Sequence, residues 1–87
     1  MRYDVRPHPP DVAQQIDALP PAVRVDLVRA LDRVAGDPWG SPSVRDDNPD
    51  AEVRVAAFGP DLAGMIVYLV LDRDRALQVE LIIWLPD

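Results

Sequence analysis

Few side chains in this sequence have the type and spacing that catalysis or metal binding requires. His8 is the single histidine and could act as a general base, but its place between prolines at a predicted strand end favours a solvated loop. Asp46, Asp47 and Asp50 offer oxygen ligands of the kind that Ca²⁺ prefers, but EF-hand spacing and a following bidentate glutamate are missing, which favours a solvated acidic loop. The sequence has no cysteine, zinc-ligand spacing, glycine-rich phosphate loop or Ser–His or Cys–His nucleophile pair. We therefore expect no cofactor and no bound metal.

The charge balance argues against a free nucleic-acid-binding protein. The 87 residues carry nine basic side chains, all arginine, against fifteen acidic ones, for a formal net charge of −6. Phosphate would be repelled at long range, so any role in nucleic-acid binding must depend on a local arginine patch. The N-terminus lacks the apolar run of a signal peptide, and no apolar stretch approaches the roughly 20 residues that span a bilayer. We expect a cytoplasmic protein that does not contact a membrane.

The prolines divide the chain into its predicted elements. None of the ten prolines lies within 22–37 or 61–85, and helix and sheet interiors need the N–H group that proline lacks. The first window predicts a helix that ends near Gly36, and the second predicts two strands, with a candidate bulge at Gly64. The predicted elements are a strand at 2–6, a helix at 10–19, a helix at 21–35, a loop at 37–50, and strands at about 51–58, 63–72 and 76–85.

This order, β-α-α-β-β-β, predicts a single α+β domain over 1–87, with two N-terminal helices packed on one face of a small antiparallel sheet. The last two strands are apolar on both faces, and Tyr68 is assigned to the face under the helices. Two helices leave the other face uncovered, which favours a partner-binding site or a dimer interface. The alternative is that the loop at 37–50 folds back over this face. The predicted binding residues are Met65, Val67 and Leu69 on the third strand, and Leu81 and Ile83 on the parity that also holds Leu77, Val79 and Leu85.

Four stretches of the chain, 19–24, 31–38, 64–70 and 79–83, together with Arg54, resemble the RelE/ParE toxin superfamily of type II toxin–antitoxin modules. The stretch 19–24, Leu-Pro-Pro-Ala-Val-Arg, is similar to the start of the family's second helix, and 31–38 is similar to its end. The stretch 64–70, Gly-Met-Ile-Val-Tyr-Leu-Val, resembles its third strand, and 79–83 resembles its last. Arg54 stands where the family places a basic residue on the second strand. The resemblance covers nearly the whole chain.

The resemblance implies two helices against a twisted antiparallel sheet and a toxin neutralised by a cognate antitoxin protein. Many members cleave mRNA on the ribosome, which requires cations beside the scissile phosphate. By resemblance, Arg54 and the nearby loop residue Arg45 are the catalytic candidates, whereas Met65 stands at the family's third-strand arginine and the usual basic segment and Tyr or His after the last strand are missing. The other interpretation of Arg54 is an exposed strand residue paired with Glu52 or Glu80.

Three functions stay open from the sequence. The first is a toxin-like component that acts as a ribosome-dependent mRNA endonuclease and translation inhibitor. The second is a non-catalytic RelE-fold protein that binds a protein partner, or a second copy of itself, through the open sheet face. The third is a gyrase-directed toxin, which does not need the cations of a ribonuclease.

Overall fold

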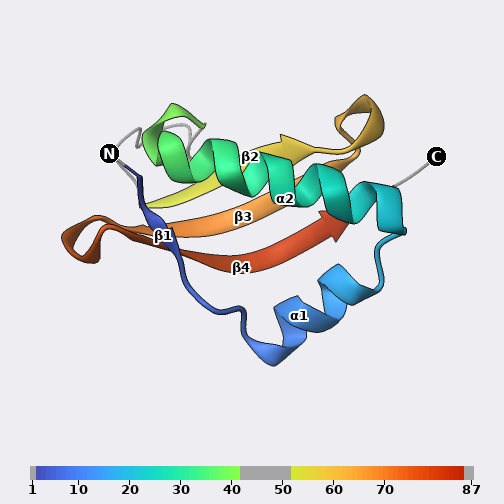
Figure 1. Ribbon diagram of the computed structural model, residues 1–87, viewed down its shortest axis with the longest axis horizontal. Coiled ribbons are helices and arrows are strands. Elements are labelled where there is room, and N and C mark those ends of the chain that lie inside the picture. Colours follow the sequence, from blue (N-terminus) through green and yellow to red (C-terminus); the bar gives the residue numbers. More distant parts are fainter. Residues whose placement is uncertain (1, 42–51, 86–87) are drawn as a thin grey trace.

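Two helices lie on one face of a four-stranded sheet in the computed structural model, which describes residues 2–41 and 52–85 (Figure 1). The strands are β1 (Asp4–Val5), β2 (Val53–Phe58), β3 (Gly64–Leu71) and β4 (Ala76–Trp84), and their order in the sheet is β1-β4-β3-β2. The predicted α+β class and element order are confirmed, and the three long strands begin and end within two residues of their predicted bounds.

The sheet is mixed, so the prediction of an antiparallel sheet is wrong for one strand. β2, β3 and β4 pair antiparallel, but β1 pairs parallel with β4, with Asp4 opposite Ala76 and Val5 opposite Leu77. Alternating side chains predict a strand without specifying its partner or direction. Here the first strand lies beside the last one in the sequence, and this long-range pairing sets its direction.

Both helices begin at a proline and run until a small or polar residue. α1 spans Pro10–Asp17 and α2 spans Pro21–Gly36, each with proline in its first turn, where the missing N–H has no intrahelical partner to lose. The buried side of α2 is an apolar stripe whose members recur at the three- and four-residue spacing of a helix. Its buried members are Val23, Leu27, Ala30, Leu31, Val34 and Ala35. No helix among the described residues is long and apolar enough to cross a membrane.

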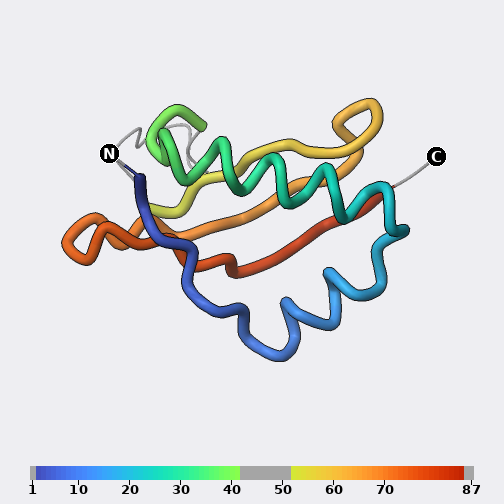
Figure 2. Tube along the Cα trace, in the orientation of Figure 1, coloured from blue at the N-terminus to red at the C-terminus, as the bar shows by residue number. Residues whose placement is uncertain are grey.

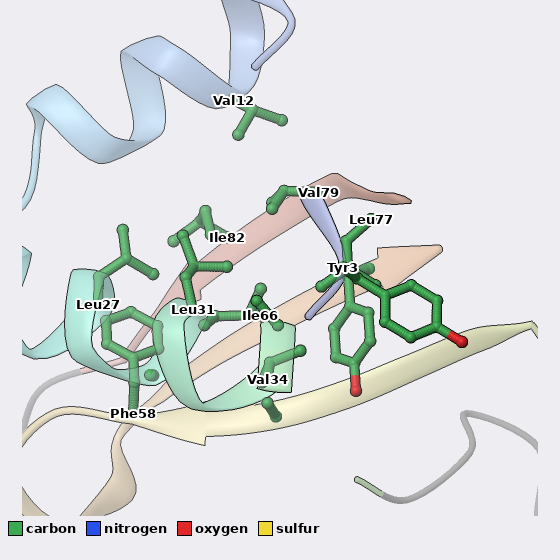
Figure 3. Close-up of a cluster of buried hydrophobic side chains, with 14 of the residues drawn as sticks. Tyr3, Val12, Leu27, Leu31, Val34, Phe58, Ile66, Leu77, Val79 and Ile82 are labelled. Carbon is green, nitrogen blue, oxygen red and sulfur yellow. The ribbon is translucent and has the colours of Figure 1, made fainter. Parts of the chain in front are cut away.

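The core lies between the helices and the sheet (Figure 3). α1 packs along β4 and contributes Val12, while α2 packs along β2 and contributes Leu27. From the sheet, Ile66 and Tyr68 of β3 are fully buried, which confirms that Tyr68 points under the helices. Val79 of β4 is also fully buried.

α1 also covers part of the β4 edge that β1 leaves unpaired. β1 reaches only the start of β4, and further along the strand the Ile82 N–H donates a hydrogen bond of 2.8 Å to the side-chain Oε1 of Gln15 on α1. A buried backbone donor needs a partner, and here a helix side chain replaces a neighbouring strand. This contact fixes α1 against the sheet edge.

A bulge in β4 changes which side chains share a face. Val67 of β3 lies opposite Leu81, whereas the next residue, Tyr68, lies opposite Val79, so Glu80 is an extra residue in the ladder. β4 bends within its length in Figure 2. The prediction of one uninterrupted parity from Leu77 to Leu85 is therefore wrong, because the extra residue reverses the alternation.

The bulge is not at Gly64, as the sequence predicted, because Gly64 pairs regularly with Phe58 on one side and Trp84 on the other. Glycine is required at this position for a different reason, which is the packing of a neighbouring ring. A Cβ at this position would lie 2.5 Å from ring carbons of Phe58, so the glycine leaves room for the close approach of that ring.

Candidate functional site

The sheet face opposite the helices gathers the residues predicted to bind a partner. Met65 lies opposite Ile83, and Val67 lies opposite Leu81. Leu69 follows on the same side of β3, opposite Val53 of β2. We call this set the open face: Val53, Val55, Ala57, Met65, Val67, Leu69, Leu81 and Ile83.

Partial exposure distinguishes the open face from the core. Met65 is 37% exposed and Leu81 is 39% exposed, while Val67, Leu69 and Ile83 are half-buried. Their neighbours along β3 on the other side are buried under the helices. The structure thus brings together the five residues predicted from the sequence, and whether residues 42–50 of the predicted loop cover them lies outside the described residues.

Polar groups on the open side of the sheet are acidic or neutral. Gln78 and Glu80 of β4 lie on this side, and the Gln78 amide donates a hydrogen bond of 3.4 Å to a Glu80 carboxylate oxygen. Within the described strands β2, β3 and β4, Arg54 is the single basic residue. It does not lie on the open face, as its burial and contacts show.

Arg54 is buried, at 6% exposure, on the helix-facing side of β2, where it lies opposite Tyr68. Its Nε donates a hydrogen bond of 2.7 Å to the carbonyl oxygen of Ser41, and its guanidinium lies 5.1 Å from the ring centroid of Trp39. The interpretation of Arg54 as an exposed strand residue is therefore wrong, because the side of β2 that it occupies faces α2 and the segment after it. Its catalytic role stays a prediction.

Tyr68 joins Arg54 in holding the segment that follows α2. Its hydroxyl donates a hydrogen bond of 2.6 Å to the carbonyl oxygen of Pro38, the first residue of the short 3-10 helix Pro38–Gly40. Burial raises the pKa of Tyr68, while a hydrogen bond with Ser41 and the charge of Arg54 act in the opposite direction. Tyr68 is thus a neutral phenol at physiological pH, and with Arg54 it ties residues 38–41 to the sheet.

A second polar cluster joins three distant parts of the chain at the β3–β4 turn. The Tyr3 hydroxyl and the Trp39 indole N–H both donate to Oδ1 of Asp72, the latter at 3.3 Å. The Arg75 guanidinium donates to the Tyr3 hydroxyl at 3.3 Å and lies over its ring. The hydrogen bond from Tyr3, followed by that from Trp39, holds the pKa of Asp72 below its usual value.

The sequence does not predict this cluster, because its members lie far apart along the chain. Asp72 and Asp74 are typical turn residues, and both do lie in the turn Asp72–Asp74. No local pattern indicated that Asp72 also accepts hydrogen bonds from Tyr3 and Trp39. The cluster fixes the β3–β4 turn to the N-terminal strand and offers no uncommitted acid or base for chemistry.

Of the remaining candidate residues from the sequence, His8 lies within the part of the chain that the structure describes. Arg45, Asp46, Asp47 and Asp50 lie outside the described residues. His8 lies in the loop between β1 and α1, where it is half-buried, and its Nδ1 is buried without a hydrogen-bond partner among the described residues.

Comparison with known proteins supports the arrangement of elements. No protein-family model and no curated protein sequence matches the chain. Among solved structures, the chain is similar to E. coli toxin RelE in the free state, determined as a mutant with two arginines replaced by alanine. The two share 18% sequence identity with a TM-score of 0.77, and the match covers 94% of this chain and 82% of that one. At this identity the likeness establishes the fold and not the activity. The chain described here therefore adopts the RelE-like fold.

Proposed function

We propose that this chain is the toxin-like component of a bacterial toxin–antitoxin module and that it binds its partner protein through the open face. The RelE-like fold supports the toxin-type assignment. The observation that carries the proposal is the apolar sheet face, with Met65 and Leu81 more than a third exposed on the side away from both helices.

The free energy gained by burying apolar side chains favours the binding of a protein to this face. Burying a large apolar side chain fully contributes about 1.5–3 kcal/mol, and partial burial contributes proportionately less. Five adjacent large side chains on two paired strands, Met65 and Val67 among them, form the kind of apolar centre around which hot spots cluster. Methionine adds an adaptable side chain that fits irregular partner surfaces. A segment of a partner protein laid across β3 and β4 would bury them together.

Ribosome-dependent mRNA cleavage ranks second. It requires cations beside the scissile phosphate, and loss of one such donor typically reduces the rate by about 10²–10³. Arg54, the single basic residue of the described strands β2–β4, lies on the helix side with its guanidinium against Ser41 and Trp39. The net charge of −6 also disfavours association with RNA. Cleavage through Arg54 would require these contacts to break.

Tightly controlled expression in a bacterial host tests the proposal. We expect the wild-type chain to arrest growth and co-expression of the protein encoded beside it in the source genome to restore growth. Because the open face lacks cations on β2–β4, arrest should occur without new mRNA 5′ ends in primer-extension analysis. New ends would favour the ribonuclease, and an absence of arrest by folded protein would refute the toxin-like assignment.

A further inference from the structure

Glu80 is a charged side chain inserted into an otherwise apolar surface. In a regular strand Glu80 and Leu81 would point to opposite faces. The bulge leaves Glu80 without an opposite residue on β3, and both Glu80 and Leu81 are exposed. Bulges recur at functional sites, where they redirect a side chain. Here the bulge places a carboxylate directly beside the exposed Leu81.

The surroundings of Glu80 leave its charge uncompensated by a cation from the sheet. The neutral amide of Gln78 donates a hydrogen bond to it at 3.4 Å. β3 and β4 contain no basic residue, and Arg54 of β2 is buried on the other side of the sheet. Arg6, beyond the end of β1, forms an ion pair of 3.1 Å with Asp74. A partner that covers the open face must therefore solvate or neutralise the Glu80 carboxylate.

We propose that Glu80 selects the partner by accepting a lysine or arginine side chain from an amphipathic segment whose apolar side chains cover the open face. This inference rests on the proposed function and names the chemistry of the partner. A carboxylate covered by an apolar segment without a cation would be left unpaired, which opposes binding, whereas a cation placed over it forms a charge-assisted hydrogen bond. Complementary charge also steers the encounter of an acidic protein with a basic segment.

A second copy of the chain fits this surface less well. Each copy carries a net charge of −6, so two copies repel each other. The open face of a second copy also offers no basic residue from β2–β4 to meet Glu80. Electrostatic complementarity therefore favours a basic partner of a different sequence.

Two synthetic probes separate these possibilities. One is a ten-residue peptide that alternates lysine with valine or leucine, and the other carries glutamate at every lysine position. We expect the lysine peptide to bind the wild-type chain with an affinity that falls as salt increases, and the glutamate peptide to bind at least ~10-fold more weakly. Calorimetric titration gives both dissociation constants.

Four variants locate the binding. We expect Glu80→Gln to weaken the lysine peptide about 3–5-fold and Glu80→Lys to weaken it at least ~10-fold. Asp17→Asn is the matched control, because it removes one negative charge from the exposed end of α1 and should change the affinity less than ~2-fold. Leu81→Asp should abolish binding, which places the peptide on the open face.

Three outcomes would overturn the inference. If Asp17→Asn weakens the lysine peptide as much as Glu80→Gln does, the attraction comes from the net charge and not from Glu80. If both peptides bind equally and Leu81→Asp abolishes both, the open face binds segments without charge selection, and the proposed function stands without this refinement. Failure of both peptides to bind would also reject it, and the proposed function would then be judged by the growth experiment.

Discussion

We expect the replacement of Arg54 by alanine to lower the free energy of unfolding by about 2–4 kcal/mol. The loss has three sources: a buried hydrogen bond from a charged donor, a cation–π contact and side-chain packing. The substitution removes the donor at 2.7 Å from the Ser41 carbonyl and the guanidinium 5.1 Å from the Trp39 ring. For a domain of this size, each kcal/mol corresponds to about 4–8 °C in Tm. Urea denaturation followed by circular dichroism and tryptophan fluorescence measures the change.

Arg29→Ala provides the control for Arg54→Ala. Arg29 lies exposed on α2, and its replacement should change the free energy of unfolding by less than about 0.5 kcal/mol. Arg54→Lys should recover part of the loss, because it keeps the charge without the planar guanidinium. If Arg54→Ala unfolds like the wild type, the contacts with Ser41 and Trp39 do not hold the residue in place, and the catalytic prediction for Arg54 gains support.

Replacing Leu81 with aspartate weakens the binding of the partner protein by at least ~10²-fold, because it places a charged carboxylate where an apolar side chain is buried in the interface, which costs several kcal/mol. Leu81 is 39% exposed in the free chain. We therefore expect the free energy of unfolding to stay within about 1 kcal/mol of the wild-type value. Calorimetric titration of the purified partner, with circular dichroism of each variant, measures both quantities.

Val28→Asp is the matched control for Leu81→Asp. Val28 is 65% exposed on α2, and the same acidic substitution there should change partner affinity less than ~2-fold. Equal losses in the two variants would mean that the loss of affinity does not depend on the open face. Loss in Val28→Asp alone would place the partner on the helices and refute the proposed binding face.

The sequence predicts the elements well because proline acts locally. Proline is excluded from the interiors of helices and strands because it lacks a backbone N–H. The two proline-free windows therefore correspond closely to α2 and to the β3–β4 hairpin. The five residues predicted on the open face also share that face in the structure. Simple alternation was sufficient for β3, which contains no extra residue on its own strand.

The features that the sequence did not predict depend on contacts between distant residues. The bulge at Glu80 arises from the register of β4 against β3, and it moves Leu77 and Val79 to the helix side while Leu81 stays on the open side. The burial of Arg54 depends on the carbonyl of Ser41 and on Trp39, more than ten residues earlier in the chain. Neither feature has a local sequence signal.

We propose that a partner protein covers the open face of this RelE-like domain. Methyl NMR spectra of the isotope-labelled chain, recorded with and without the partner protein, test it most directly. We expect the largest shift changes at Val67, Leu81 and Ile83, which lie together on β3 and β4. Large changes at Val25 and Val28, the exposed valines of α2, with the open-face methyl groups unchanged, would contradict the claim.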